Sequence, residues 1–247
     1  NRLVALPPYP RPMSHPVPDA DVQATIAQLW IHPVKSCAAV SVQEAELTPT
    51  GLAWDRAWMV VDSQGAFVTQ RELPRMALVQ PSFKLGQLVL RAPGMLALHL
   101  SLEAAEFPRR VRVWDDAVDA WDMGDLAAQW FSDFQGPDAP ADLKQLRLVR
   151  FDPEVKRLCS AKWTGGRESV TQFADGFGVL VASTASLDEL NTRLAKAGEA
   201  PVDMRRFRPN IVLGGVEAAD EDRIGAWRVH TEGGVAEITE ELNLSPV

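Results

Sequence analysis

Short stretches in which apolar and polar residues alternate recur along most of the chain. In residues 24–31, Ala-Thr-Ile-Ala-Gln-Leu-Trp-Ile, apolar side chains alternate with polar or small ones, as in a strand with one buried face. Ala92-Pro93-Gly94 and Asp115-Asp116 each separate two such stretches and predict hairpins. Further strands are predicted at 40–47, 57–61, 66–69, 87–91, 96–100, 110–114, 117–121 and 146–150. Many short strands at this spacing are typical of a barrel or a sandwich.

Two other stretches have the spacing of an amphipathic helix. The first, residues 122–134, is predicted to begin with Asp122 as its N-cap. The second is predicted to begin with Ser186 as its N-cap, paired with Glu189 in a capping box, and to end at Gly198. The predicted buried faces hold Leu126, Trp130 and Phe131 in the first helix and Leu187, Leu190 and Leu194 in the second.

The pattern divides the chain into an arm and two units. Residues 1–21 contain six prolines, so this arm is expected to be extended and poorly paired, either as a loose tail or as a docked strap. The first unit is predicted to span residues 22–150 and the second residues 151–247, with a long loop without periodicity at 152–172. The strands of the second unit are predicted at 179–182, 210–214, 226–230 and 234–238.

Composition excludes several classes of protein. The 247 residues are 46% hydrophobic, which is too apolar for disorder and enough to bury a core without staples. Cys37 and Cys159 are the only cysteines, so a disulfide scaffold and a cysteine-ligated iron–sulfur cluster are excluded. The net charge of −8 argues against a nucleic-acid partner. We find no apolar run that could span a bilayer and no signal-peptide core, and therefore expect a cytoplasmic protein without a membrane partner.

Common catalytic motifs are absent from the sequence. The phosphate-binding patterns GxxxxGK[ST] and GxGxxG and the nucleophile pattern GxSxG do not occur, so nucleotide-binding and hydrolase interpretations lose support. The four histidines form no HxxxH pair and the cysteines form no CxxC pair. A zinc site built by the protein alone is therefore not favoured.

Three clusters place hydrogen-bond donors and positive charge at predicted strand ends. In residues 32–37, Lys35 and Ser36 offer an ammonium group, a hydroxyl and backbone N–H groups, which suit an anionic oxygen. The alternative is an ordinary turn with a solvated lysine. In the second cluster, the Arg56 guanidinium could stack on a neighbouring tryptophan or bind a phosphate, or it could simply pair with Asp55 or another carboxylate. Arg71, with Gln70, adds donors after the predicted strand 66–69.

The third cluster is Arg-Arg-Phe-Arg-Pro-Asn at residues 205–210. In a strand-like stretch, Arg206 and Arg208 would share one face that Asn210 continues. The alternative is a solvated basic edge. Three arginines in four positions are unusual in a chain with 33 acidic and 25 basic residues, and local concentration of donors is how an acidic protein builds an anion site. The residues therefore predict convergence on an oxyanionic ligand without identifying it.

The same segments resemble a known family. Residues 26–37 resemble the opening of the N-terminal β-barrel domain that precedes MOSC domains, and residues 173–177, Phe-Ala-Asp-Gly-Phe, are similar to the loop that opens the MOSC domain. The resemblance covers about residues 22–238 and implies an α+β, β-rich fold: an N-terminal β-barrel domain followed by a MOSC-type mixed β-barrel with flanking helices. Residues 51–60, 69–76, 185–191 and 206–212 are also similar to family segments.

The family includes the mitochondrial amidoxime-reducing component and its bacterial relatives, which hold a molybdenum cofactor and reduce N-hydroxylated compounds. The resemblance implies a molybdenum-cofactor-dependent oxidoreductase with a small-molecule substrate and a separate reductase or ferredoxin-type electron donor. It also carries a family-level association with pyridoxal phosphate binding. The residues implied to bind the cofactor are Lys35, Ser36, Arg56, Arg71, Asp175, Gly176, Arg208 and Asn210.

The metal ligand of the family is not found in this chain. In the family, a thiolate from a cysteine-rich segment binds molybdenum after the strand that residues 235–238 resemble, whereas residues 239–247 contain no cysteine. The second unit is therefore expected to be incomplete at its C-terminus, through omitted residues, a truncated gene or a non-catalytic relative. Cys37 adjoins the Lys-Ser pair but is not assigned this role. Alternative functions are a non-catalytic binding or carrier module for the cofactor or another phosphorylated ligand, and a purely structural barrel.

Overall fold

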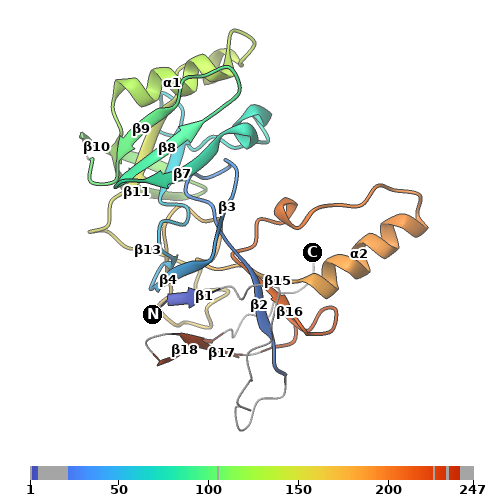
Figure 1. Ribbon diagram of the computed structural model, residues 1–247. Helices are drawn as coiled ribbons and strands as arrows, with labels where there is room; N and C mark the ends of the chain where they lie inside the picture. Colours follow the sequence, from blue (N-terminus) through green and yellow to red (C-terminus); the bar gives the residue numbers. More distant parts are fainter. Residues whose placement is uncertain (1, 5–21, 105, 225, 232–233, 240–247) are drawn as a thin grey trace.

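The chain forms an upper lobe and a lower part (Figure 1). The computed structural model describes residues 2–4, 22–104, 106–224, 226–231 and 234–239. The content is strand-rich α+β, as predicted. None of the helices in these ranges is long and apolar enough to cross a membrane. The helices are α1 (Asp125–Gln135), α2 (Thr184–Lys196) and the 3-10 helices η1 (Pro74–Leu78), η2 (Ala141–Leu143) and η3 (Met204–Arg206). The strands are β1 (Arg2–Val4), β2 (Thr25–Ile31), β3 (Val40–Val42), β4 (Glu44–Thr48), β5 (Gly51–Leu52), β6 (Trp58–Val61), β7 (Gln80–Lys84), β8 (Gln87–Arg91), β9 (Leu98–Ser101), β10 (Phe107–Val113), β11 (Asp116–Asp122), β12 (Arg147–Phe151), β13 (Arg157–Leu158), β14 (Val170–Thr171), β15 (Val181–Ser183), β16 (Ile211–Gly214), β17 (Ala226–Thr231) and β18 (Gly234–Thr239).

The upper lobe is built on the sheet β10-β11-β12-β6, which lies between two clusters of buried side chains. All four residues of β6 are buried: Trp58 and Val60 belong to one cluster, and Met59 and Val61 belong to the other. Successive side chains of a strand point to opposite faces, so a strand between two cores must be apolar throughout. Because β6 begins two residues after Arg56, its burial fixes the segment that carries this arginine.

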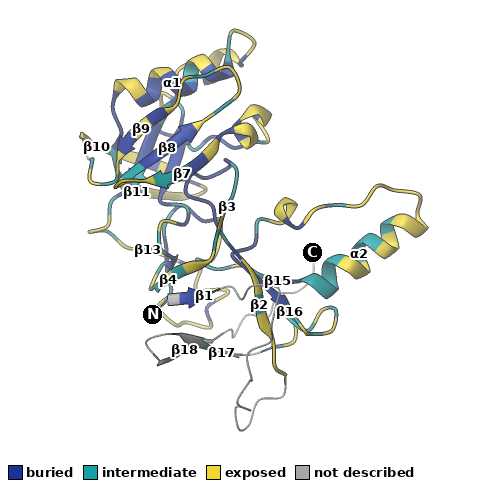
Figure 2. Cartoon of the chain, in the orientation of Figure 1, coloured by how far each residue is buried: buried dark blue, intermediate teal, exposed yellow. Residues whose placement is uncertain are grey.

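The sheet β7-β8-β9 and helix α1 complete the upper lobe, and both predicted hairpins form. Helix α1 buries Trp130, Phe131 and Phe134 against the core, as the buried face in Figure 2 shows. Leu126 was predicted on this face but is 71% exposed. The buried face of α1 starts at Ala127, one residue after Leu126. The helical period of 3.6 residues therefore turns Leu126 toward solvent.

The prediction that Asp122 caps the first helix is wrong. Asp122 is the last residue of β11, and α1 begins after Gly124, whose φ of 86° favours glycine. The buried Asp122 carboxylate instead accepts hydrogen bonds from the Gly124 N–H and from the side chains of Arg109 and Arg147. A carboxylate surrounded by arginines gains more from these partners than from a helix end.

The sheet β15-β16-β2-β3 lies in the lower part of the molecule. Strand β16 runs antiparallel to β2 and parallel to β15. Its core side chains include Leu29 and Ile31 from β2 and Ile211 and Leu213 from β16. Strands β2 and β16 lie on opposite sides of the boundary predicted at residue 150, so this sheet joins the two predicted units. The division of the chain at that point remains a prediction.

Helix α2 begins three residues earlier than predicted. Ser183, not Ser186, is the N-cap, and its Oγ accepts the Ser186 N–H at 3.0 Å. Glu189 forms an ion pair with Arg193 one turn along and takes no part in capping. The predicted end is confirmed, because Gly198 follows the C-cap with φ of 78°. No residue of α2 is fully buried (Figure 2), so the helix covers the sheet with a half-buried face only.

Four other predictions need correction. Residues 2–4 are paired with β4, and Leu3 is fully buried, because this stretch precedes the prolines and keeps its N–H groups. The remaining arm, residues 5–21, lies outside the described residues. The predicted strand 40–47 is two strands, β3 and β4, which join different sheets. The predicted strand 66–69 forms only isolated bridges, and the predicted loop 152–172 contains the short pair β13-β14.

Candidate functional site

A cavity of about 650 Å³ lies where loops from both parts of the chain meet. Its walls come from the turn after β2, the segment before β6, the turn around β5, and the loops that precede β15 and β16. The structure brings all eight sequence-predicted binding residues into this one cavity. They are Lys35, Ser36, Arg56, Arg71, Asp175, Gly176, Arg208 and Asn210.

Lys35 is buried in the cavity wall and is not a solvated turn residue. Its backbone N–H donates to the Trp58 carbonyl at 2.8 Å, which fixes the turn against the start of β6. The residue is 5% exposed, and Nζ donates to the Phe173 carbonyl at 2.9 Å and to the Asp175 carboxylate. Burial lowers the pKa of Lys35 from its usual value, and the Asp175 carboxylate opposes that shift. Ser36 follows in the left-handed region with φ of 67°.

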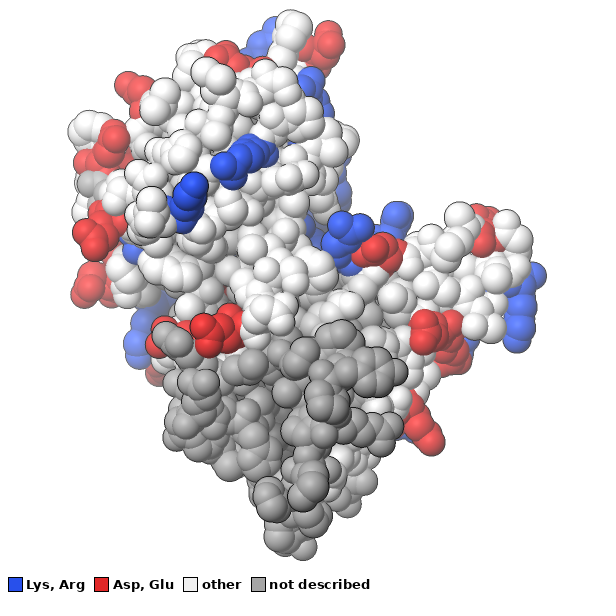
Figure 3. Space-filling view, in the orientation of Figure 1, with Lys and Arg blue, Asp and Glu red and all other residues white. Residues whose placement is uncertain are grey.

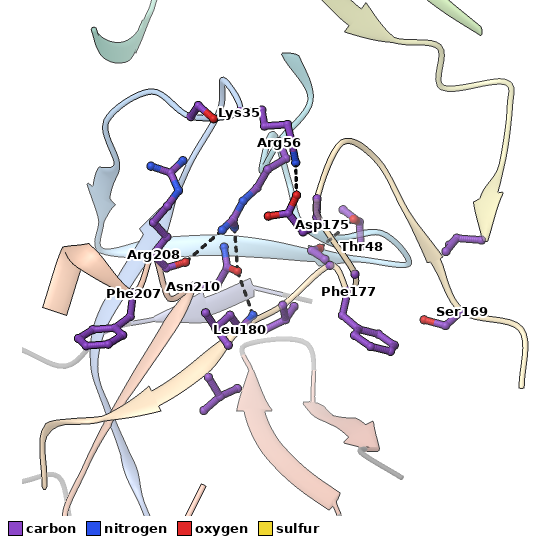
Figure 4. Close-up of a pocket in the computed structure, with 18 of the residues that line it drawn as sticks. Lys35, Thr48, Arg56, Ser169, Asp175, Phe177, Leu180, Phe207, Arg208 and Asn210 are labelled. Carbon is purple, nitrogen blue, oxygen red and sulfur yellow. Dashed lines mark hydrogen bonds and ion pairs between the residues drawn. The ribbon is translucent and has the colours of Figure 1, made fainter. Parts of the chain in front are cut away.

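Arg56 is held by three acceptors. Its guanidinium donates to the Asp55 carboxylate. It also donates to Asn210 Oδ1 at 3.0 Å and to the Arg208 carbonyl at 3.0 Å (Figure 4). Asp55 is buried and also accepts the His32 N–H at 2.7 Å. Burial raises the pKa of Asp55, against the charge and hydrogen bond of Arg56. The pairing of Arg56 with Asp55 that the sequence left open therefore exists, but inside the cavity wall and not on the surface.

Arg208 is a half-buried cation with a buried donor that is unused among the described residues. The residue has φ of 57°, and Nη1 donates to the Cys37 carbonyl at 2.7 Å, whereas Nη2 is buried without a partner. Within the described part of the chain it forms no ion pair. Burial and then the charge of Arg56 lower the pKa of Arg208 to about 10. An unsatisfied buried donor of this kind calls for a ligand, an ion or a water.

His32 lies behind these cations and is neutral at physiological pH. Its Nε2 lies 3.2 Å from the Pro209 carbonyl, and Nδ1 has no partner among the described residues. Burial, followed by the charges of Arg56 and Arg208, lowers the pKa of His32 to about 2. The imidazole is therefore uncharged and adds no positive charge to this part of the cavity wall. The positive charge at this end of the cavity comes from Lys35, Arg56 and Arg208.

At the rim of the cavity, the turn between β10 and β11 contacts the loop that carries Asp175. Asp175 Oδ1 accepts from Trp114 Nε1 at 2.9 Å, and Trp114 lies in the turn between β10 and β11. Burial acts to raise the pKa of Asp175, but Lys35 and Trp114 bring it below its usual value. Arg71 is exposed, with its guanidinium 5.6 Å from the Trp114 ring. A Cβ on Gly176 would meet no atom within 4 Å, so the cavity has free space beside this backbone.

Asn210 uses its amide within the chain. It is 1% exposed; Oδ1 accepts from Arg56 and from the Leu180 N–H at 3.0 Å, and Nδ2 donates to the Trp30 carbonyl at 3.2 Å. The residue therefore positions Arg56 and the loop before β15. The predicted row of Arg206, Arg208 and Asn210 on one strand face is wrong, because residues 204–206 form the helix η3 and Arg206 does not line the cavity.

Sequence reasoning missed several residues that line the cavity, and also Trp114, which contacts Asp175 beside it. Trp114 gave no local signal, because its contact with Asp175 joins residues far apart in the chain. Phe177, Leu180 and Phe207 also line the cavity, although the sequence pattern did not mark them as binding residues. The acidic residues Glu221 and Asp222 also line it. In the space-filling view, Lys and Arg side chains gather in the notch between the upper lobe and the segment carrying α2 (Figure 3).

The two cysteines do not face the cavity. Cys37 is fully buried, and burial raises the pKa of its thiol to about 12, so it is not a thiolate at physiological pH. Cys159 is also buried and lies outside the cavity lining. Among the residues with described positions, no group of three or more His, Cys, Asp and Glu side chains could hold a metal ion. The described site therefore offers donors for an anion but no such group of metal-binding side chains.

Two protein-family models match the chain. The MOSC N-terminal beta barrel domain matches residues 23–138, and the MOSC domain matches residues 168–242. The chain therefore belongs to the family of proteins in which these two domains occur together. These matches agree with the α+β, β-rich fold and with the resemblance found in the sequence.

Among curated proteins, the relatives include mitochondrial amidoxime-reducing components. Mitochondrial amidoxime reducing component 2 of Bos taurus is 39% identical over 206 residues, which cover 80% of this chain and 58% of the relative. The same component of Homo sapiens is 36% identical with the same coverage, and component 1 of Homo sapiens is 34% identical. The chain thus spans 58% of the length of these relatives. A solution structure of a Bordetella bronchiseptica protein covers 44% of this chain with 27% identity and a TM-score of 0.34, too low to establish a shared fold.

Membership at family level is associated with the molybdenum cofactor and with reductase chemistry. The described residues fit the anionic part of such a cofactor, because Arg208 Nη2 is an unpartnered buried donor beside Lys35 and Arg56. Free space beside Gly176 fits a ligand that passes close to the backbone. The association with pyridoxal phosphate and the cytoplasmic location remain predictions.

Proposed function

We propose that this chain forms the cofactor-binding part of a molybdenum-cofactor-dependent oxidoreductase that reduces N-hydroxylated or N-oxygenated small molecules. The observation that carries the proposal is the buried, unpartnered Nη2 of Arg208, in a cavity that also presents Lys35 and Arg56. Arg208 forms no ion pair among the described residues, and a buried donor on such a cation favours a bound oxyanion; the cofactor carries a phosphate. The names of the relatives, amidoxime-reducing components, support this reaction class.

In this proposal, Arg208 and Lys35 bind the anionic part of the cofactor, and Ser36 and Gly176 supply a hydroxyl and close backbone approach. Arg56 contributes charge while Asn210 holds it in place. Arg71 lies at the exposed rim, where its side chain can move to contact the ligand while its guanidinium stays hydrated. The bound cofactor supplies the redox-active metal at which the N–O bond of the substrate is reduced.

The protein's own contribution is position and charge. Asp175 pairs with Lys35 and favours the charged form of its ammonium group against the effect of burial on the pKa. The fixed dipoles and charges of this wall need no rearrangement when an anionic ligand binds, which is how such sites gain affinity. Electrons would reach the metal from a separate reductase or a ferredoxin-type protein.

A second function is a non-catalytic binding or carrier module for the same cofactor or another phosphorylated ligand. The observation that favours it is that neither cysteine lines the cavity and that the Cys37 thiol is protonated. The reductase requires a metal ligand from elsewhere, whereas a carrier needs only the anion-binding wall.

Turnover separates the two proposals. The protein, produced in a host with ample molybdenum cofactor, is given an aryl amidoxime and a reduced viologen dye as the chemical electron donor. We expect amidine formation in the wild type, a loss of at least tenfold in kcat/KM for Arg208→Gln, and unchanged kinetics for Arg193→Gln, an exposed arginine on α2. Bound pterin without turnover would select the carrier function. Neither bound pterin nor turnover would overturn both.

A further inference from the structure

Arg157 on β13 ties the turn between β10 and β11 to residues 172–175, which we call the Asp175 loop. Its side chain is 6% exposed and does not line the cavity. Arg157 Nε donates at 2.7 Å to the carboxylate of Asp116, the first residue of β11. Arg157 Nη1 donates to the Gln172 carbonyl at 2.8 Å and to the Ala174 carbonyl at 2.6 Å. A buried guanidinium with these three acceptors fixes the turn and the loop to each other.

Trp114, in the same turn, contacts the Asp175 carboxylate directly. Its Nε1 donates at 2.9 Å to Asp175 Oδ1, the oxygen that also accepts from Lys35 Nζ. The Trp114 ring packs against Phe67, with the ring centroids 4.9 Å apart. Trp114 has φ of 52°, in the left-handed region that a bulky side chain rarely adopts, and such a conformation persists only where the surrounding contacts hold it. The turn and Phe67 therefore aim the indole at Asp175.

This contact joins the two parts of the chain that match family models. Trp114 lies within residues 23–138, the match to the MOSC N-terminal beta barrel domain. Asp175 lies within residues 168–242, the match to the MOSC domain, and Arg157 lies between the two matches. The hairpin of the first domain thus reaches the loop that forms part of the cavity wall in the second.

The indole N–H and the Lys35 ammonium group share one carboxylate oxygen. An ammonium group has three hydrogens to donate. Among the described residues, Lys35 gives one to the Phe173 carbonyl and one to Asp175 Oδ1, and the third remains for a ligand in the cavity. The Asp175 side chain is 67% exposed, and an exposed ion pair alone fixes a side chain only weakly. The donor from Trp114 therefore decides how the carboxylate meets Lys35.

We propose that Trp114 is a positioning residue of the cavity, which holds the Asp175 carboxylate by one oxygen so that Lys35 keeps a donor for a bound anion. This inference rests on the proposed function for the identity of that anion. A carboxylate released from the indole can turn both of its oxygens toward the ammonium group and compete with the ligand. Arg157 supports the arrangement, because it holds the turn and the Asp175 loop together.

The rate of pterin loss from the holoprotein tests this role. Protein from a cofactor-replete host is dialysed, and the pterin that remains per chain is followed by fluorescence after oxidation. Trp114→Phe keeps a ring against Phe67 but has no N–H, and we expect it to lose pterin about fivefold faster than the wild type. Trp163→Phe is the matched control and should lose pterin at the wild-type rate, since Trp163 is exposed to a similar degree and does not line the cavity.

A double-mutant cycle separates positioning from support of the fold. Asp175→Ala removes the acceptor, so the addition of Trp114→Phe to this variant should change the rate of pterin loss by less than about twofold. An unchanged rate in Trp114→Phe alone would overturn the inference. The same acceleration with and without the Asp175 carboxylate would also overturn it, because the ring would then act only through the fold.

Failure of the proposed function has a different signature. If the wild type holds no pterin, the proposed function is refuted, and the same variants are titrated by calorimetry with inorganic phosphate. Phosphate binding about fivefold weaker in Trp114→Phe, with no such loss in the Asp175→Ala background, would then support the positioning role. Equal phosphate binding by the wild type and Trp114→Phe, or no binding by either, would overturn it.

Discussion

The backbone contact between Gly178 and the turn before β5 allows a sharp test of how the cavity wall is built. A methyl group on Gly178 would lie 2.2 Å from the Thr50 carbonyl oxygen and 2.9 Å from the Gly51 nitrogen. Ordinary van der Waals contact begins at 3.4 Å, so Gly178→Ala must separate the two backbones by about 1 Å. No flexible side chain end is available to yield, because every contacting atom belongs to the main chain.

The expected cost follows from that geometry. Overpacking a well-packed site costs 1–3 kcal/mol, and a clash between two backbones belongs at the upper end, so we expect a loss of about 3 kcal/mol in the free energy of unfolding. For a chain of this size, this corresponds to a fall of roughly 6–12 °C in Tm. The displaced segment carries Phe177 and Leu180, and ligand binding in the cavity should weaken with it.

Urea unfolding by the linear extrapolation method measures the effect. Gly176→Ala is the matched control, since a Cβ at Gly176, two residues away in the same loop, would meet no atom within 4 Å and should change the stability by less than about 0.5 kcal/mol. If Gly178→Ala were as stable as the wild type, or if both variants lost the same unfolding free energy, the cavity wall would not depend on this contact.

Three further predictions concern charge, core packing and hydrogen bonding. Burial acts to raise the pKa of Asp122, but hydrogen bonds from Arg147 and the Gly124 N–H bring the pKa below its usual value. The ionised carboxylate therefore stabilises the fold above about pH 4. This contribution disappears as the pH falls through the lowered pKa. Asp122→Asn should flatten the fall in Tm between pH 5 and about pH 2, and an unchanged acid profile would contradict this reasoning. Phe131→Ala should lose about 3–5 kcal/mol of unfolding free energy in urea, whereas Leu126→Ala on the exposed face of α1 should lose less than about 0.5; equal losses would refute the assigned face. Asn210→Ala removes the hydrogen bonds of Asn210 to the Arg56 guanidinium, the Leu180 N–H and the Trp30 carbonyl and should cost about 3 kcal/mol by the same assay, and retained stability would show that these bonds do not support the wall.

Local patterns predicted most strands, because alternation and turn residues act over a few positions. The hairpins β8-β9 and β10-β11 are confirmed by their pairing. The helix caps were wrong because a serine or aspartate near a helix start has several competing partners. Ser183 takes the cap that Ser186 was predicted to form, and Asp122 is engaged by arginines from two other strands. The pairing of β2 with β16 could not be predicted, since nothing local identifies a partner strand so far along the chain.

The cavity itself followed from the sequence better than the roles of its residues. All eight predicted binding residues line it: six belong to donor clusters at strand ends, which are recognisable locally, and Asp175 and Gly176 were implied by the family resemblance. The burial of Lys35 and of the unpartnered Nη2 of Arg208 depends on packing that no motif encodes. Asn210 proved to be engaged entirely within the chain, and the roles of Trp114, Phe177, Leu180 and Phe207 emerged only from the folded arrangement.

The most direct test of the anion-binding cavity is the number of pterin and molybdenum equivalents per chain in protein purified from a cofactor-replete host. Oxidised pterin is measured by fluorescence and molybdenum by elemental analysis. We predict pterin close to one equivalent in the wild type, a loss of at least tenfold in Arg208→Gln, and no change in Arg193→Gln, whose side chain is exposed on α2. Absence of pterin from the wild type, or equal pterin content in all three proteins, would contradict the account.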